Sequence, residues 1–285
     1  MKLKKLLILL VLLTLMPILV SCDLSFDFFT STTTEIIQMS SLPTAINGTI
    51  TFEDTDYDDL PVYISPTYSL TNIDEYNNIL LETQDFARHA NIEVLNTMKN
   101  DRNRVEGSSS GSGFIFMEDD EFYYAITNYH VVDPGEFSST YDIKTYEDDI
   151  FNSATLIAYD IDIDLAVLKF QKLSREAVTI INIYERLYYK FNRGELVIAV
   201  GNPLDLTNNV TFGEFKGMEE IDNVDYSVIY HDAKIYSGSS GGALVDVDGI
   251  LLGVNTWGTG ESEVYSFAIP NYIVYIFLIN YGILD

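Results

Sequence analysis

The chain has 285 residues, a formal net charge of −27 at pH 7 and 47% hydrophobic residues. This length and hydrophobic content are typical of a globular protein with one large core or two small ones, and they exclude a disordered chain. A polyanion of this charge repels DNA and RNA backbones, so we expect no nucleic-acid partner. With three histidines and one cysteine, a zinc site would have to rest on carboxylates, and we expect neither a metal nor another cofactor.

The first 21 residues have the layout of a secretion signal. Three lysines at positions 2, 4 and 5 precede an apolar stretch that is too short for a comfortable transmembrane span. The stretch ends in Leu-Val-Ser-Cys and resembles a bacterial lipobox, in which the cysteine is lipidated and becomes the new N-terminus. Cys22 is the only cysteine, so a disulfide within the chain does not explain it. We therefore expect residues 1–21 to be a lipoprotein signal peptide, and the lipid on Cys22 to hold the protein at the outer face of a cell membrane.

Residues 22–71 show little periodicity. They are rich in Ser and Thr and include an acidic run at 53–59. We predict a weakly ordered acidic tether over 22–71, although the apolar runs at 50–52 and 60–64 leave a small extra motif open. From residue 72 the spacing predicts a helix over 72–90, a strand over 91–98 and an exposed loop over 99–110.

Beyond residue 110 the chain is a series of short strands separated by turns, which is typical of an all-β barrel or sandwich. An apolar run at 271–281 predicts a short helix packed on that barrel. The predicted strands are 113–117, 121–127, 153–159, 165–170, 196–200, 210–216, 227–231, 243–247, 250–256 and 263–269.

Ser240 lies in a Gly- and Ser-rich run at 237–242, ahead of a strand, an Asp-Gly turn and another strand. Such a turn can hold a hydroxyl outward and direct N–H groups to one point, although a Gly/Ser run alone marks an ordinary turn more often. Far upstream, His130 ends one apolar strand and Asp164 begins another. The order His, Asp, Ser belongs to one of the known arrangements for serine-nucleophile catalysis.

Six sequence blocks in this order resemble the trypsin-like serine proteases of the HtrA/Deg type. One departure is Ser239, which replaces the usual asparagine before the nucleophile. The blocks are Gly-Ser-Gly-Phe-Ile at 111–115, Thr-Asn-Tyr-His-Val-Val at 127–132, Asp-Leu-Ala-Val-Leu at 164–168, Val-Gly-Asn-Pro at 200–203, Gly-Ser-Ser-Gly-Gly-Ala-Leu at 238–244 and Phe-Ala-Ile-Pro at 267–270.

The resemblance implies an all-β, chymotrypsin-like double β-barrel over residues 72–285, with an N-terminal helix and a short C-terminal helix. It also implies a serine endopeptidase in which Ser240 is the nucleophile and His130 the general base. Asp160, Asp162 and Asp164 share one strand parity, and only the resemblance selects Asp164 as the residue that orients His130. The backbone N–H groups of Gly238 and Ser240 would form the oxyanion hole. The remaining histidines, His89 and His231, are weaker candidates for the base.

The substrate pocket of this fold is built from the stretch before the serine and the strand after it. Here that implies Lys234, Ile235, Val254, Asn255 and Thr256. Ile235 and Val254 favour a small aliphatic substrate side chain, as in HtrA/Deg proteases. Lys234 departs from the small residue expected there, and it leaves open an acidic substrate side chain, as in glutamyl endopeptidases.

HtrA/Deg proteases usually continue into PDZ domains, whereas this sequence ends at Asp285 directly after the predicted barrels. We therefore expect no PDZ domain and no regulation through one. The expected partners are protein or peptide substrates outside the cytoplasm, in particular unfolded proteins, and the membrane that the lipid enters. The oligomeric state is open. The alternative function is a non-catalytic binding module on the same scaffold.

Overall fold

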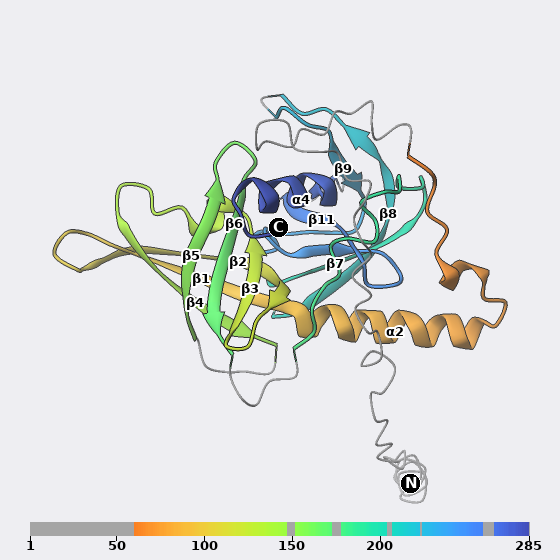
Figure 1. Cartoon of the computed structure of the whole chain (residues 1–285), viewed down its shortest axis with the longest axis horizontal. Coiled ribbons are helices and arrows are strands. Elements are labelled where there is room, and N and C mark those ends of the chain that lie inside the picture. Colours follow the sequence, from red (N-terminus) through yellow and green to blue (C-terminus); the bar gives the residue numbers. More distant parts are fainter. Residues whose placement is uncertain are drawn as a thin grey trace, which may run out of the picture. The chain divides into compact units, whose positions relative to one another are not determined.

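Twelve strands in the described residues form two closed antiparallel barrels in the computed structural model (Figure 1). The structure describes residues 60–146, 152–172, 178–203, 207–222, 224–258 and 265–284, all within one compact unit, Thr44–Asp285. The predicted signal peptide, Cys22 and residues 22–59 of the predicted tether lie outside the described residues. No described helix is long and apolar enough to cross a membrane.

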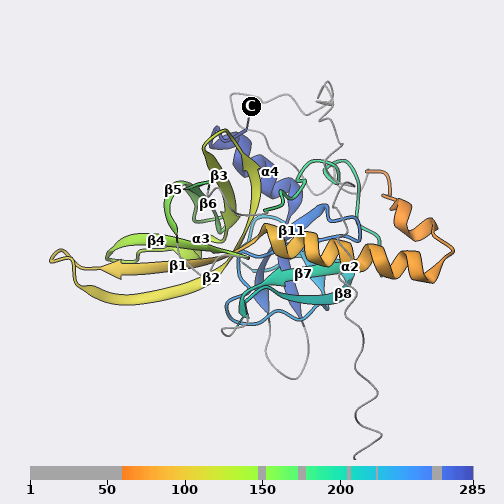
Figure 2. The same cartoon turned by 90° about the horizontal axis from the view of Figure 1, so that it is seen from below.

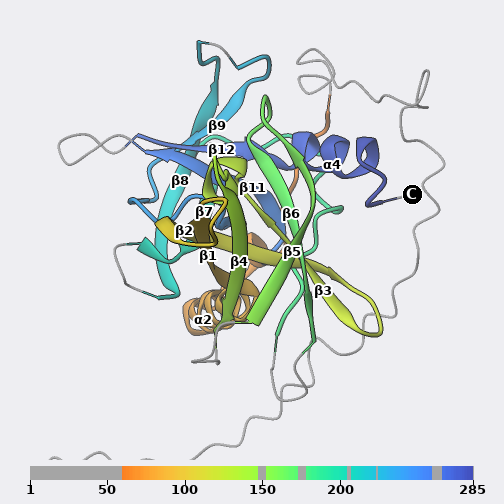
Figure 3. The ribbon, with the colours of Figure 1, turned by 90° about the vertical axis from the view of Figure 1, so that its left-hand side faces the viewer.

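The first barrel has the strand order β1-β2-β3-β6-β5-β4 and faces the viewer in Figure 3. It includes one additional short helix, α3 (Tyr129–Val132), directly after β3. Its strands are β1 (Asn91–Lys99), β2 (Val105–Glu118), β3 (Phe122–Thr127), β4 (Ser138–Thr145), β5 (Asn152–Asp160) and β6 (Leu165–Gln171).

The second barrel has the order β10-β11-β12-β9-β8-β7. Its strands are β7 (Leu196–Gly201), β8 (Asn209–Glu219), β9 (Val228–His231), β10 (Ala243–Val245), β11 (Leu251–Gly258) and β12 (Ser266–Pro270). Because both barrels close on themselves, neither leaves a long unpaired edge. The predicted all-β, chymotrypsin-like double barrel is confirmed.

Two helices flank the barrels. Helix α2 (Ile73–Ala90) begins at Asn72, whose side chain accepts a hydrogen bond from the Asp74 N–H, and it packs on β2, β7 and β8 (Figure 2). Helix α4 (Asn271–Asn280) follows Pro270 and packs on β11 and β12. Its residues from Asn271 to Leu278 are all buried, which explains why the apolar run has no polar face.

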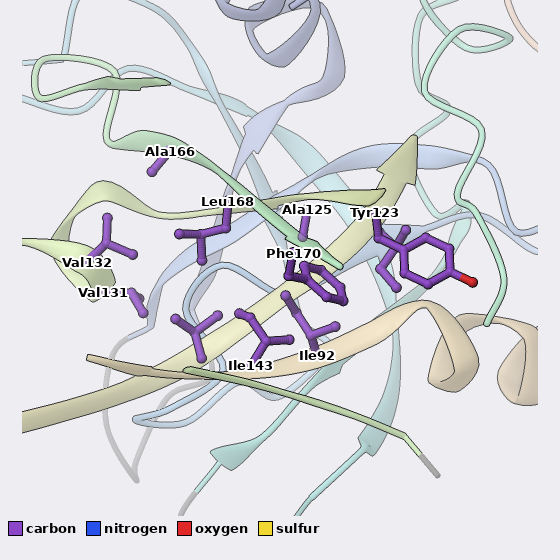
Figure 4. Close-up of a cluster of buried hydrophobic side chains, with 11 residues drawn as sticks. Ile92, Tyr123, Ala125, Val131, Val132, Ile143, Ala166, Leu168 and Phe170 are labelled. Carbon is purple, nitrogen blue, oxygen red and sulfur yellow. The ribbon is translucent and has the colours of Figure 1, made fainter. Parts of the chain in front are cut away.

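The core of the first barrel is drawn in Figure 4. Alternating residues of its strands point inward, as the period of two requires. Leu168 and Ala125 are fully buried there, and Val131 and Val132 from helix α3 pack on the same cluster. This cluster anchors α3, the element that carries His130.

Residues 60–71, the end of the predicted tether, pack on the second barrel, and they include the apolar run at 60–64 for which the sequence leaves a small extra motif open. The Thr67 hydroxyl donates to an Asp248 carboxylate oxygen at 2.5 Å, and the Asn192 side-chain amide donates to the Tyr63 carbonyl at 2.7 Å. A short helical turn, η1 (Pro66–Ser69), lies in this segment. No sequence pattern indicates where this segment docks, because its contacts are polar and aromatic pairs with residues far along the chain rather than a periodic apolar face.

One strand was not predicted, and another begins inside a predicted loop. Strand β4 was missed because Ile143 is its only fully buried hydrophobic side chain, so the sequence has almost no alternation to detect. Strand β2 begins at Val105, inside the stretch predicted as an exposed loop over 99–110. Its Gly- and Ser-rich first half pairs with β1 through the backbone, which needs no apolar side chains.

The Leu168→Ala substitution tests the core of the first barrel. We expect it to lower the free energy of unfolding by about 2–5 kcal/mol, because a buried leucine leaves a cavity as well as losing its transfer energy. Leu81 on helix α2 is 63% exposed and supplies the matched control, with a change of about 0.5 kcal/mol or less. Urea unfolding of both variants makes the comparison, and equal losses would contradict the assignment of the core.

Candidate active site

His130 lies at the junction of strand β3 and helix α3. Two neighbours fix this junction to the start of strand β6: the Asn128 side-chain amide and the Tyr129 N–H both donate to the Asp164 carbonyl, at 2.9 and 3.2 Å. The chain therefore holds the backbone of His130 beside Asp164 before the two side chains meet.

The Asp164 carboxylate receives hydrogen bonds from both the backbone and the ring of His130. The His130 N–H donates to Oδ1 at 2.9 Å, and His130 Nδ1 lies 2.9 Å from Oδ2 and 3.1 Å from Oδ1. Because a carboxylate accepts, Nδ1 carries the proton and a neutral ring leaves Nε2 free to accept another. The His130 side chain is 47% exposed and that of Asp164 16%, so the ring reaches the surface while the carboxylate stays covered.

Thr256 of strand β11 connects this pair to Ser240. The Thr256 hydroxyl donates to Asp164 Oδ2 at 3.0 Å, and the Thr256 carbonyl accepts the Ser240 hydroxyl at 3.1 Å. No hydrogen bond between described residues joins Ser240 to His130 in this structure. In this structure the Ser240 hydroxyl is hydrogen-bonded to a backbone carbonyl, and the histidine–aspartate pair is formed beside it.

Two glycines set the shape of the serine loop. Gly238 and Gly241 have φ of +96° and +86°, a region that residues with a Cβ rarely adopt. A Cβ on Gly241 would lie 2.2 Å from the Ser112 carbonyl oxygen, and one on Gly238 would lie 2.6 Å from the Asn202 carbonyl oxygen. The loop is therefore pressed against β2 of the first barrel and the turn after β7.

The backbone N–H groups of Gly238 and Ser240 donate no hydrogen bond to any other described residue. Their neighbours in the loop are paired: the Ser239 N–H donates to the Tyr236 carbonyl at 2.8 Å and the Gly241 N–H to the Asn255 carbonyl at 2.8 Å. Two unpaired donors on either side of Ser239 are what the binding of an oxyanion requires.

The other acidic candidates have different surroundings. Asp160 Oδ1 accepts from the N–H groups of Asp162 and Ile163, at 3.0 and 3.1 Å, and so shapes the turn between β5 and β6. Asp164, with φ of +60°, ends that turn and alone contacts His130. Within the described residues, no group of three or more His, Cys, Asp or Glu side chains is arranged to hold a metal ion.

The other two histidines do not approach the serine. His89 lies on helix α2, where its Nδ1 is 2.8 Å from the Asp85 carbonyl and its ring is 4.6 Å from that of Tyr146. His231 on strand β9 is fully buried in the second barrel beside Asn255. Burial lowers the pKa of His231 to about 4, because the barrel interior solvates the charged ring poorly.

The predicted pocket residues divide into two groups. Lys234 is exposed, and its ammonium forms no ion pair with another described residue. Ile235 lies against Gly258, where a Cβ would be 3.1 Å from the isoleucine side chain. Both side chains are at least partly exposed and can therefore contact a substrate.

The other three predicted pocket residues have almost no exposed surface. Val254 is fully buried and pairs with Ala243 inside the second barrel, so its side chain exposes no surface to a substrate. Asn255 donates to the Gly242 and Ala243 carbonyls, and Thr256 contacts Asp164 and Ser240. Sequence reasoning had missed this contribution of Thr256 to the serine and the aspartate.

Two barrels with a His–Asp pair on one and a glycine-flanked serine on the other define the chymotrypsin-type class of proteins. The family model described as "Trypsin-like peptidase domain" matches residues 111–254, about half of the chain, and the chain belongs to that family. The match spans the histidine, the aspartate and the serine discussed above.

Similarity to curated proteins points to one branch of the family. "Serine protease Do-like HtrA" of Bacillus subtilis is 32% identical over 211 residues, which cover 70% of this chain and 45% of the relative. "Probable periplasmic serine endoprotease DegP-like" of Chlamydia muridarum is 37% identical over 169 residues, 56% of this chain and 31% of the relative. The chain thus spans about half the length, or less, of these relatives.

Solved structures agree with this placement. The serine endoprotease of Yersinia pestis is 30% identical with a TM-score of 0.53, over 69% of this chain and 64% of that one. An HtrA-type protease solved with a tripeptide is 27% identical with a TM-score of 0.55, over 69% of this chain and 61% of that one.

The buried His231 makes stability depend on pH. Its pKa in the folded protein is about 4, against 6.5 for the ordinary side chain, so the unfolded chain binds the proton first as the pH falls. This contribution is complete above pH 6.5 and is lost as the pH drops towards 4, by about 2 kcal/mol between pH 7 and pH 5.

The His231→Gln variant lacks this titration. We expect its free energy of unfolding, measured in urea at pH 7 and pH 5, to fall by about 2 kcal/mol less than that of the unmodified protein over the same interval. The same decrease in both proteins would show that His231 takes up its proton in the folded state.

Proposed function

We propose that the protein is a serine endopeptidase in which His130, Asp164 and Ser240 act as a catalytic triad. The observation that carries this proposal is the His130–Asp164 contact of 2.9 Å, held next to Ser240 through Thr256. Membership of the trypsin-like peptidase family and the serine proteases among the relatives support it.

The first half of the reaction forms an acyl-enzyme. The Ser240 hydroxyl turns from the Thr256 carbonyl to His130 Nε2, which takes its proton while Oγ bonds to the substrate carbonyl carbon. The negative charge that develops on the carbonyl oxygen is stabilised by the N–H groups of Gly238 and Ser240. His130 then gives the proton to the peptide nitrogen, and the C–N bond breaks.

The second half returns the enzyme. A water molecule gives a proton to His130 Nε2 and its oxygen bonds to the acyl carbon, and the proton then returns to Ser240 Oγ as the ester bond breaks. Asp164 keeps Nδ1 protonated throughout and stabilises the ring when it is charged. No step in this sequence needs a cofactor.

The serine is tested by its removal. We expect Ser240→Ala to fold normally and to cleave an unfolded protein such as reduced casein at least about 10⁴-fold more slowly. Ser237→Ala, three residues earlier in the same loop and exposed, is the control and should retain activity. If the purified protein binds unfolded chains without cleaving them, the alternative of a non-catalytic binding module is correct.

We propose a small aliphatic residue on the N-terminal side of the cleaved bond. Ile235, close against Gly258, favours a narrow apolar pocket. Lys234 is exposed, and its ammonium has no ion pair among the described residues, which favours the alternative of an acidic residue at the same place. One set of peptides decides between them.

Fluorogenic peptides that differ only in that residue, Val, Phe, Lys or Glu, are to be compared by kcat/KM. We expect the Val peptide to be the best substrate and Lys234→Ala to leave its rate within about twofold. Lys99→Ala, at the end of strand β1, removes the same charge elsewhere. A preference for Glu that disappears in Lys234→Ala but persists in Lys99→Ala would establish the acidic alternative.

We propose that the protein works outside the cytoplasm on unfolded proteins, held to the membrane by a lipid on Cys22. The signal-like leader and its single cysteine support the anchor, and the name of the Chlamydia relative places that protein in the periplasm. Expression of the full chain in a bacterium supplied with labelled palmitate should label the protein and place it in the membrane fraction. Cys22→Ala should abolish both, and a labelled or membrane-bound Cys22→Ala protein would contradict the anchor.

A further inference from the structure

Ser112 is a buried serine of strand β2 whose N–H and hydroxyl both donate hydrogen bonds to the loop that carries Ser240. Its N–H donates to the Ser240 carbonyl at 2.8 Å, and its hydroxyl donates to the Gly238 carbonyl at 2.6 Å. The residue is fully buried, and it comes from the other barrel. One side chain and one amide of the first barrel therefore hold both carbonyls that flank Ser239.

The Ser112 hydroxyl is itself fixed from behind. It accepts the Asn202 N–H at 2.7 Å, while the Ser112 carbonyl accepts the Thr127 hydroxyl at 2.6 Å. A hydroxyl that accepts from one side and donates to the other is polarised along the chain of bonds, which strengthens its bond to Gly238. The Asn202 N–H thus leaves the hydroxyl proton of Ser112 pointing towards the Gly238 carbonyl.

Within the described residues, Ser112 is the only hydrogen-bond donor to the Gly238 carbonyl. The end of strand β7 packs against both, because a Cβ on Gly201 would be 3.0 Å from Ser112 Oγ and 3.1 Å from Ser239 Cα. The Asn202 side chain ties that turn to β1, with its amide donating to the Ile92 carbonyl at 2.8 Å. Ser112 is the residue through which this scaffold reaches the Gly238 carbonyl.

We propose that Ser112 is a positioning residue for the oxyanion hole. Its hydroxyl sets where Gly238, and with it the unpaired Gly238 N–H, lies relative to Ser240. The Ser112 hydroxyl does not touch the substrate. The inference rests on the proposed function, since it matters to the reaction only if the two N–H groups bind the oxyanion.

Removing the hydroxyl has a predictable consequence. Ser112→Ala removes the partner of the partly buried Gly238 carbonyl and of the buried Asn202 N–H, which is unfavourable, so we expect the loop to shift until other groups satisfy them. The Ser112 backbone N–H still holds the Ser240 carbonyl. Ser240 therefore keeps its position while the Gly238 N–H moves. The variant loses stabilisation of the transition state rather than affinity for the substrate.

The experiment compares the unmodified protein, Ser112→Ala and Ser110→Ala with one peptide substrate. Ser110 lies two residues earlier on the same strand, is exposed and makes no side-chain hydrogen bond with the described residues. We expect Ser112→Ala to lower kcat about 10- to 100-fold with KM changed less than about twofold, and Ser110→Ala to change neither. A peptide boronate, which mimics the tetrahedral intermediate, should lose a similar factor in affinity while a product peptide does not.

If the unmodified protein neither cleaves the peptide nor binds the boronate, the proposed function itself is wrong. If the unmodified protein is active and folded Ser112→Ala has the same kcat, only the role of Ser112 is wrong. A rise in KM without a change in kcat also overturns that role, because it would place the effect on substrate binding.

If Ser112→Ala fails to fold, Ser112→Cys takes its place: the thiol fills a similar volume but is a weak donor. We expect Ser112→Cys to keep the native thermal stability with kcat reduced at least about fivefold, and an unreduced kcat would overturn the role.

Discussion

The Asp164 carboxylate joins the two barrels at the candidate active site. It accepts the backbone N–H and the ring Nδ1 of His130 from the first barrel, and the hydroxyl of Thr256 from the second. Hydrogen bonds to a charged group contribute about 1.5–3 kcal/mol each, and a covered carboxylate without them is costly. The carboxylate therefore fixes both the orientation of the histidine and the position of the barrel that supplies the serine.

This arrangement carries a local cost that its surroundings offset. Asp164 has φ of +60°, and a non-glycine residue in such a conformation costs about 1–3 kcal/mol. Its own carbonyl accepts two hydrogen bonds, from Asn128 and Tyr129, which hold the strained residue in place. Their donors, Asn128 and Tyr129, lie at the start of the helix that carries His130. The same two hydrogen bonds therefore hold Asp164 in its strained conformation and place His130 beside it.

The residues that would do chemistry were the easiest to find in the sequence. His130, Asp164 and Ser240 occur in the order and the local contexts of a known arrangement, and the structure brings His130 against Asp164 with Ser240 on the neighbouring Thr256. Strand alternation alone left Asp160 and Asp162 open, because the choice depends on a turn that no alternation pattern describes. Alternation between turns predicted only an all-β barrel or sandwich, and the double barrel followed from the resemblance of the six sequence blocks.

What escaped prediction depends on hydrogen bonds rather than on hydrophobic pattern. Strand β4 and the first half of β2 pair through the backbone with few apolar side chains, and residues 60–71 dock through polar contacts such as Thr67 with Asp248. Val254 was placed in the pocket because the resemblance implies a pocket wall from the strand after the serine, whereas its side chain is fully buried in the second barrel. Ser112 was read as part of a sequence block, and only the three-dimensional contacts show what its hydroxyl holds.

Catalysis by the proposed triad requires Ser240 to be an activated nucleophile beside a formed oxyanion hole. The decisive measurement is the reaction of the folded protein, from Cys22 onward, with a fluorophosphonate probe, because the phosphonylated serine places an oxygen where the oxyanion would lie. We expect one probe per protein molecule, located on Ser240 by mass spectrometry of the peptide fragments, and no labelling of His130→Ala. Ser240 is not the nucleophile if the folded protein takes up no probe or takes it up on another residue.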